Sequence, residues 1–173
     1  MVRLGEIYRG GEGYMVLADE IILKEATIAD AVLFENYQLK ETPYTVKPMT
    51  AMTDSLHETK KFPVLILKEE TLVGFFILQK EKGFSTYPTE ENALLLHAHS
   101  IDERFQNKGY GKLSMERLPL FIKENFDSID EIVLAVDYDN LSGQMLYLKT
   151  GFVDTKKRSK EDGAYKFIYS KKI

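Results

Sequence analysis

The chain of 173 residues is long enough for one domain with a substantial hydrophobic core. Hydrophobic residues make up 44% and charged residues 29%, a composition typical of soluble globular proteins rather than of disordered, collagen-like or membrane chains. Lysine and arginine number 23 and aspartate and glutamate 27, so the net charge of −4 gives no general attraction for nucleic acid or anionic lipid.

The chain contains no cysteine, which excludes disulfides, thiolate metal sites and a cysteine nucleophile and fits a reducing compartment. Residues 1–6 lack the apolar run of a signal peptide, and no segment approaches the ~20 apolar residues of a membrane span. We therefore expect a cytoplasmic protein.

Residues 1–20 are rich in glycine and are expected to form an extra hairpin that turns near Gly10 and Gly11. These glycines do not indicate a phosphate-binding loop, because no helix start follows them. The chain shows no internal repeat or low-complexity linker, so residues 1–173 are expected to form a single domain.

The first half of the chain predicts strands and two short helices. Thr27, with Asp30 three residues later, is expected to cap the first helix, and a long polar loop is expected over 80–92. The elements in chain order are a strand over 21–25, an amphipathic helix over 28–39, a short helix over 51–57, and an antiparallel hairpin of strands over 62–68 and 72–79.

The second half alternates strands with helices. Its first strand is a nearly continuous apolar run, which indicates a central strand buried on both faces. We expect a kink at Pro119 in the following helix, an N-cap at Asn140, and a helix end at Gly151. The elements are a strand over 93–101, a helix over 115–126, a strand over 131–136, a helix over 141–148, and a terminal hairpin of strands over 152–157 and 165–169.

The segment 106–112 lies between the central strand and the next helix. Gly109 and Gly111, two residues apart, let backbone N–H groups converge on one point at the helix start, where the helix adds about half a positive charge. Lys108 and Lys112 can add side-chain donors. A pyrophosphate therefore fits this segment better than a neutral ligand does.

Two common phosphate-loop patterns do not match this segment. The nucleoside-triphosphate loop requires glycine where Gln106 stands and serine or threonine where Leu113 stands. The dinucleotide fingerprint requires a third glycine where Ser114 stands, and no clear acidic ribose partner follows. The pattern Gln/Arg-x-x-Gly-x-Gly/Ala, by contrast, matches Gln106, Gly109 and Gly111.

With this loop the chain resembles the GCN5-related N-acetyltransferase (GNAT) family, which binds acetyl-CoA through the same pattern. The run from Asn140 to Phe152 looks like the family's Asn…Leu-Tyr-x-Lys-x-Gly-Phe element, and the resemblance covers roughly residues 21–173. It implies an α/β (α+β) fold, in which helices flank a central mixed sheet and the cofactor arm enters between two splayed parallel strands, here 93–101 and 131–136.

The sequence departs from the family pattern at two positions. Asn107 stands where the family commonly has glycine, and asparagine tolerates the left-handed conformation that such a loop uses. Glu103 stands where the family usually has proline. Neither change removes a donor that phosphates require.

The resemblance also implies a set of binding residues. The backbone of the strand end would hold the pantetheine arm and polarise the acetyl oxygen, and Asn140 would hydrogen-bond the arm or serve as the helix cap. The implied residues are His99, Ser100, Ile101, Gln106, Asn107, Lys108, Gly109, Tyr110, Gly111, Lys112 and Asn140. Acetyl-CoA is the implied co-substrate.

Two residues are candidates for proton transfer. A primary amine of pKa ~10 is neutral about once in a thousand molecules at pH 7, so its free base costs about 4 kcal/mol. By resemblance to arylalkylamine-type members, His97 would act as base or proton relay, and strand parity predicts that it shares a face with Leu95 and His99. Tyr147 would protonate the leaving thiolate. Core packing remains the alternative for each of these side chains.

The pair His97 and His99 can also bind metal, but with His57 as the one further histidine no ligand set has suitable spacing, and we expect no metal. Direct acetyl transfer to a primary amine in a ternary complex is the expected reaction. Acidic stretches, the net charge and the run 101–106, which looks like that of small bacterial diamine and polyamine acetyltransferases, favour a small cationic amine.

Several alternatives stay open at this point. The acceptor can instead be an amine of a protein or peptide, and the chain can be a non-catalytic acyl-CoA sensor or a nucleotide-binding module. We expect neither nucleic acid nor membrane as a partner. The sequence leaves the oligomeric state open, a homodimer included.

Overall fold

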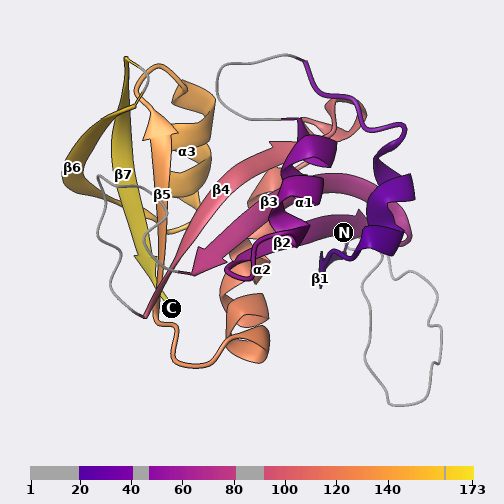
Figure 1. Cartoon of the computed structure of the whole chain (residues 1–173). Coiled ribbons are helices and arrows are strands. Elements are labelled where there is room, and N and C mark those ends of the chain that lie inside the picture. The colour runs from indigo at the N-terminus through magenta and orange to yellow at the C-terminus, as the bar shows by residue number, and fades with distance from the viewer. Residues whose placement is uncertain (1–19, 41–46, 81–91, 162) are drawn as a thin grey trace, which may run out of the picture.

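The computed structural model describes residues 20–40, 47–80, 92–161 and 163–173. The hairpin expected over 1–20 and the polar loop expected over 80–92 therefore lie almost wholly outside the described residues. The elements are β1 (Ile21–Glu25), η1 (Ile28–Phe34), α1 (Pro48–Leu56), β2 (Lys61–Lys68), β3 (Thr71–Lys80), β4 (Ala93–Ile101), η2 (Glu103–Phe105), α2 (Tyr110–Asn125), β5 (Glu131–Asp137), α3 (Leu141–Lys149), β6 (Val153–Glu161) and β7 (Ala164–Lys172) (Figure 1).

Every strand and helix expected within the described residues has a counterpart, but the first two helices differ from expectation. The helix expected over 28–39 is a 3₁₀ helix that ends at Phe34, because Ile28 and Val32 are 70% and 61% exposed and bury no continuous apolar stripe. The second helix begins at Pro48, three residues early, since proline presets the backbone of a first helical turn.

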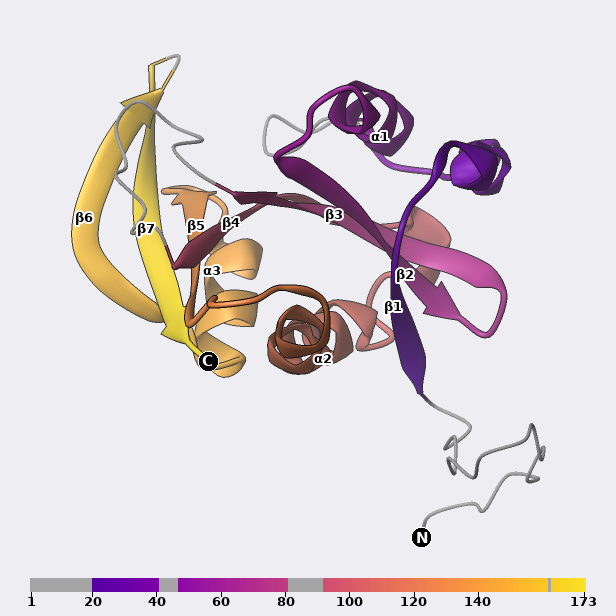
Figure 2. The ribbon, with the colours of Figure 1, turned by 60° about the horizontal axis from the view of Figure 1, so that its bottom comes forward.

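Seven strands form one mixed sheet in the order β1-β2-β3-β4-β5-β7-β6. Every neighbouring pair is antiparallel except β4 and β5, which run parallel and are joined through the crossover helix α2. Figure 2 shows α1 on one side of the sheet and α2 and α3 on the other. The sheet thus has an α1 face and an α2/α3 face.

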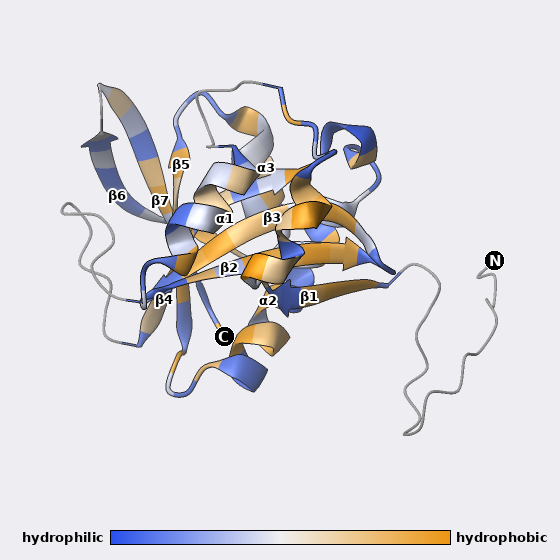
Figure 3. Cartoon of the chain, turned by 45° about the vertical axis from the view of Figure 1, so that its right-hand side comes forward, coloured by the Kyte–Doolittle hydropathy of each residue, from blue (hydrophilic) through white to orange (hydrophobic). Residues whose placement is uncertain are grey.

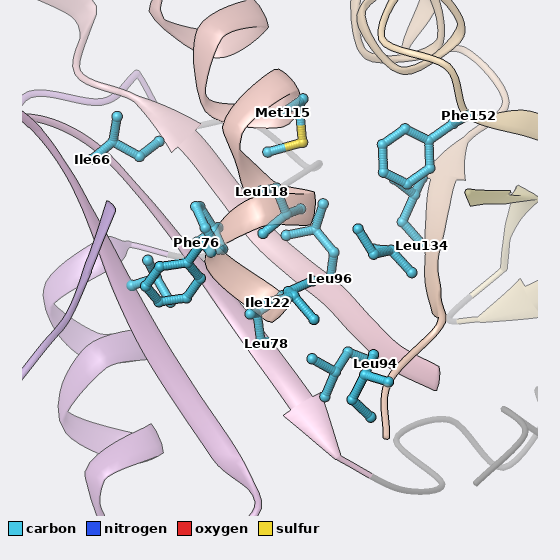
Figure 4. Packing of buried hydrophobic residues seen from close by; sticks show 14 of the residues in the cluster. Ile66, Phe76, Leu78, Leu94, Leu96, Met115, Leu118, Ile122, Leu134 and Phe152 are labelled. Carbon is cyan, nitrogen blue, oxygen red and sulfur yellow. The ribbon is translucent and has the colours of Figure 1, made fainter. Parts of the chain in front are cut away.

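A hydrophobic core lies on each face of the sheet. On the α2/α3 face, Leu94 and Leu96 of β4 pack with Met115 and Leu118 of α2 and with Leu134 of β5 (Figure 4). On the α1 face a smaller cluster joins α1 and η1 to the inner strands. Figure 3 shows β2 and β3 as largely hydrophobic ribbons, as expected for strands covered on both sides.

The strands β4 and β5 pair over only part of their length. Their ladder joins 93–96 to 131–134 and then stops, while β4 continues beside β3 and β5 continues beside β7. The two strands accordingly lie together at one end and apart at the other (Figure 1). Beyond Leu96 and Leu134 the sheet opens into a wedge, and this confirms the splay that the resemblance implies.

Candidate active site

A cavity of about 730 Å³ occupies the wedge. Its walls come from 97–101 of β4, from 135–137 of β5, from the loop before α2 and from the start of α3. Of the sequence-predicted site residues, all except Lys108 line it, namely His97, His99, Ser100, Ile101, Gln106, Asn107, Gly109, Tyr110, Gly111, Lys112, Asn140 and Tyr147. The fold thus collects residues from both predicted motifs around one space.

The loop before α2 has the backbone that an anion-binding turn requires. Asn107 has a φ of 59° and Gly109 a φ of 88°, so both adopt the left-handed conformation, as predicted for Asn107. The first α-helical bond runs from Leu113 N to Gly109 O, which leaves the N–H groups of residues 110–112 without intrahelical acceptors. The Gln106 amide donates to Ile101 O at 3.0 Å and ties the loop to β4.

The two lysines of the loop are engaged within the protein. The Lys112 ammonium pairs with Glu116 Oε1 at 2.8 Å, one helical turn further on, and the Lys108 ammonium lies 5.3 Å from the centre of the Phe105 ring. The backbone amides at the positive end of the α2 dipole are therefore the donors that this wall can offer to an anion.

A β-bulge lies in β4 at the point where the wedge opens. His97 pairs with Ile77 and Ser100 with Phe75, so two residues of β4, Ala98 and His99, lie opposite Phe76 alone. Ala98 takes up the extra length with a φ of 53°, a left-handed conformation that is rare for alanine. The bulge interrupts the alternation of side chains along the strand.

The bulge places His97 and His99 on opposite faces of the sheet. His99 contacts Ser114 of α2 and the ring of Phe76 on the α2/α3 face. His97 follows the parity of Leu95 and faces the α1 side, where Lys61 and Glu58 are the nearby charges. The prediction that His97 and His99 share a face is wrong, because strand parity holds only in the absence of a bulge.

His99 is held by the first turn of α2. The Ser114 hydroxyl donates to Gly111 O at 2.9 Å, and His99 Nε2 lies 3.3 Å from Ser114 Oγ. Because the hydroxyl has a single proton, His99 must donate from Nε2 in this arrangement. Burial lowers the pKa of His99 to about 4, so its ring is neutral near pH 7.

His97 is also neutral near pH 7. Its pKa is lowered to about 4, first by burial and then by the positive charge of Lys61, while Glu58 acts in the opposite direction. Its Nε2 is buried and has no hydrogen-bond partner among the described residues. His97 lines the cavity, and its unpaired ring nitrogen distinguishes it from a core histidine whose ring nitrogens are hydrogen-bonded.

Tyr147 of α3 reaches the wedge from the α2/α3 face. Its ring centre lies 6.3 Å from that of His99 and 5.6 Å from that of Phe152. Burial raises its pKa, so the phenol keeps its proton at neutral pH.

Asn140 caps α3 through an Oδ1 that accepts from Gly143 N at 3.0 Å, which confirms the predicted cap and leaves its amide N–H₂ as a donor.

The segment 37–39, which follows η1 on the α1 face, is hydrogen-bonded to the end of β4. The Tyr37 and Ser100 hydroxyls lie 2.9 Å apart, Gln38 N donates to Asp102 Oδ2 at 3.2 Å, and Glu103 N donates to Gln38 O at 2.7 Å. Arg104 also binds the fully buried Asp102 carboxylate, through Nη2 at 2.7 Å. These bonds hold Leu39 in the cavity wall.

Several lining residues were not identified as site residues from the sequence, among them Leu39, Asp137 and Lys166. One signal could have indicated Asp137, since it ends β5 and the carboxyl ends of parallel strands converge at one edge of a sheet. Leu39 and Lys166 carry no such signal. No group of three His, Asp or Glu side chains among the described residues is placed to hold a metal ion.

Comparisons with known proteins agree with this geometry. The profile of the acetyltransferase (GNAT) family matches residues 30–152. An uncharacterized N-acetyltransferase of Bacillus subtilis, YbbJ, is 38% identical over 116 residues, which span 66% of this chain and 72% of YbbJ. Within the described residues, no helix combines the length and apolar character needed to cross a bilayer.

Solved structures of low sequence identity have the same fold. The aminoglycoside acetyltransferase AAC(6')-Ib in complex with coenzyme A is 14% identical and superimposes with a TM-score of 0.70, over 88% of this chain and 95% of its own. A chimera of the spermidine N-acetyltransferase SpeG from Vibrio cholerae is 16% identical, with a TM-score of 0.63 over 88% of this chain and 94% of its own.

Proposed function

Because the chain belongs to the GNAT family of acetyltransferases, we propose that it transfers acetyl from acetyl-CoA to a primary amine by direct attack in a ternary complex, with a small cationic amine as acceptor. As a family member it is an acetyl-CoA-dependent N-acetyltransferase, and acetyl-CoA is its co-substrate. The proposal depends chiefly on the wedge cavity, which joins the α2 loop on one face of the sheet to His97 on the other.

The cavity supports a cofactor-binding side on the α2/α3 face. The backbone N–H groups of residues 107–112 bind the diphosphate of the coenzyme at the positive end of α2. A Cβ added at Gly109 would meet nothing within 4 Å, so a diphosphate can approach the backbone there. Asn140 donates its amide to the pantetheine arm, and the unpaired edge of β4 from His99 to Ile101 polarises the acetyl oxygen.

Tyr147 provides the proton for the departing sulfur. A phenol whose pKa burial raises is fully protonated at neutral pH, and it donates only as negative charge develops on the thiolate. The absence of cysteine agrees with direct transfer, because no thiol is available to carry an acyl intermediate.

His97 accepts the proton of the attacking amine. With a pKa of about 4 it is a free base at pH 7, but removing a proton from an ammonium of pKa ~10 would be uphill by about 8 kcal/mol. The ammonium therefore loses its first proton to solvent before it attacks, because a protonated nitrogen has no lone pair. His97 takes the second proton once the new N–C bond begins to form, when the nitrogen is far more acidic. His97 thus accepts a proton on the α1 face of the sheet, while Tyr147 donates a proton on the α2/α3 face.

The acceptor side supports an amine that carries positive charge. The chain has a net charge of −4, and two of its structural neighbours are named as acetyltransferases of aminoglycosides and of spermidine, which carry several amines. An amine of a protein or peptide is the second candidate, since another structural neighbour, 14% identical with a TM-score of 0.65, is described as modifying the N-terminal serine of a ribosomal protein.

A thiol-release assay with acetyl-CoA and a panel of amines tests this proposal. The panel contains aliphatic diamines, spermidine, an aminoglycoside, an amino acid and a peptide with a free N-terminus. We expect the highest kcat/KM for a small cationic amine. Tight binding of coenzyme A without turnover of any acceptor would instead identify a sensor, and preferential binding of ATP or NAD would identify a nucleotide-binding module.

A further inference from the structure

The acceptor side of the wedge contains a carboxylate that the proposed reaction does not use. Paired residues of a parallel ladder share a face, so the pairs Leu94–Ile132 and Leu96–Leu134 define the α2/α3 face of both strands. Ala135 and Asp137 alternate with the buried Leu134 and Val136. Asp137 therefore lies on the α1 face, as His97 does, across the wedge from it.

The Asp137 carboxylate has no ion-pair or hydrogen-bond partner among the described residues, although its backbone carbonyl accepts from Gln144. Two other half-buried carboxylates are engaged, Asp154 by Arg158 and Glu131 by Lys172, and the fully buried Asp102 binds Arg104. A half-buried carboxylate without a partner at the wall of a cavity favours a cationic ligand there.

A cationic ligand can present its reacting ammonium or a second one to this carboxylate. Binding the reacting ammonium would raise its pKa and reduce the free base that attacks the thioester, tenfold for each unit of pKa. Binding a second ammonium has no such cost, because that group keeps its charge throughout the reaction. The chemistry of the transfer therefore favours the second, non-reacting group.

We propose that Asp137 binds a non-reacting ammonium of the acceptor, so that the protein acetylates diamines or polyamines in preference to monoamines. This inference rests on the proposed function and specifies its acceptor. Lys166 pairs with Asp137 across the β5–β7 ladder and also lines the cavity. Lys166 is the competing group. If its ammonium faced the far end of the acceptor, the protein would prefer an acceptor with a carboxylate at that end.

Three acceptors with the same reacting end and similar length separate these chemistries: 1,5-diaminopentane, pentylamine and 5-aminopentanoate. The kcat/KM of each is measured for the native protein and for Asp137→Asn. The matched control is Asp139→Asn, which removes the same charge two residues later at an exposed position outside the cavity. Calorimetry of 1,5-diaminopentane binding to the coenzyme A complex gives a readout that needs no turnover.

We expect the native protein to prefer the diamine, and Asp137→Asn to lose about tenfold or more in kcat/KM for the diamine and in its affinity, as expected for a hydrogen bond to a charged group. Its kcat/KM for pentylamine should change less than about twofold, and Asp139→Asn should behave as the native protein.

Equal losses for diamine and monoamine would overturn the inference, because Asp137 would then act on the reacting group. A native preference for 5-aminopentanoate would also overturn it and would point to Lys166. Both results leave acetyl transfer to a primary amine intact, although a preference for 5-aminopentanoate would replace the small cationic amine as the proposed acceptor. Binding of coenzyme A without turnover of any of the three amines would contradict the proposed function, and the calorimetric difference would still decide whether Asp137 binds a diamine.

Discussion

His97 and His99, two residues apart in β4, lie on opposite faces of the central sheet because Ala98 forms a bulge with a φ of 53°. His99 contacts Ser114 on the α2/α3 face, the proposed cofactor side, and His97 faces the α1 side, the proposed acceptor side. The bulge lies just beyond Leu96, where the pairing of β4 with β5 ends. The bulge thus places the two histidines on the two faces of the sheet to which we assign the cofactor and the acceptor.

Replacing Tyr147 by phenylalanine should lower kcat by about 100-fold or more, because the leaving sulfur loses its proton donor while the ring packing remains. The dissociation constant of coenzyme A should change less than about twofold. Steady-state kinetics and calorimetry measure the two quantities. Tyr165→Phe, at a position 58% exposed, is the matched control. A parallel loss of kcat and coenzyme A affinity would show that Tyr147 acts by packing.

The dependence of kcat/KM on pH should show no histidine inflection near pH 6.5. Burial lowers the pKa of His97 to about 4, so its neutral form is present throughout pH 5.5 to 9, and its protonation impairs the reaction only below that range. The value of kcat/KM should instead rise about tenfold per pH unit below the pKa of the amine, because the fraction of free base rises in that proportion. An inflection near pH 6.5 that disappears in His97→Gln would contradict this account.

Asn107 should prove critical for its backbone rather than for its side chain. Asn107→Gly keeps the left-handed conformation and should bind coenzyme A as the native protein does. Asn107→Val disfavours a φ of 59° and should weaken binding by about 1 to 2 kcal/mol, roughly five- to thirtyfold in the dissociation constant. Calorimetry with coenzyme A measures both. If both variants weaken binding equally, the side chain itself contacts the ligand.

Asp102→Asn should destabilise the protein at neutral pH by about 1 to 3 kcal/mol, because a fully buried acceptor loses its charge-assisted bonds from Arg104. Burial acts to raise the pKa of Asp102, but hydrogen bonds from Arg104 and Gln38 outweigh it and lower the pKa. The carboxylate therefore contributes stability above pH ~3.9, and this contribution is lost as pH falls further.

Urea unfolding at several pH values tests this prediction for Asp102. The difference between native protein and variant should be constant from pH 5 to 8 and should shrink below pH ~3.9. Asp139→Asn, which removes an exposed charge, should leave the unfolding free energy almost unchanged. A difference that persists unchanged at pH 2.5 would show that the carboxylate charge does not contribute.

Local signals in the sequence predict much of this fold. The order of strands and helices follows from hydrophobic periodicity and from caps such as Asn140, whose partner Gly143 lies three residues away. The left-handed Asn107 and the glycine at the end of α3 follow from backbone preferences. These features depend on a few neighbouring residues, so a single sequence contains the information.

Other features depend on contacts between distant segments. Alanine gives no signal for a left-handed residue, and the bulge at Ala98 lies where β4 stays paired with β3 and is no longer paired with β5. The Tyr37–Ser100 bond joins residues 63 positions apart. The Lys112–Glu116 pair, by contrast, has the spacing of a helical ion pair and could have been expected.

A crystal structure of the complex with coenzyme A is the decisive experiment for the proposed cofactor site. We expect the diphosphate within hydrogen-bond distance of the backbone N–H groups of residues 107–112, with the sulfur in the wedge between β4 and β5 and next to the Tyr147 hydroxyl. A diphosphate bound away from this loop, or a Tyr147 hydroxyl that points away from the sulfur, would contradict it.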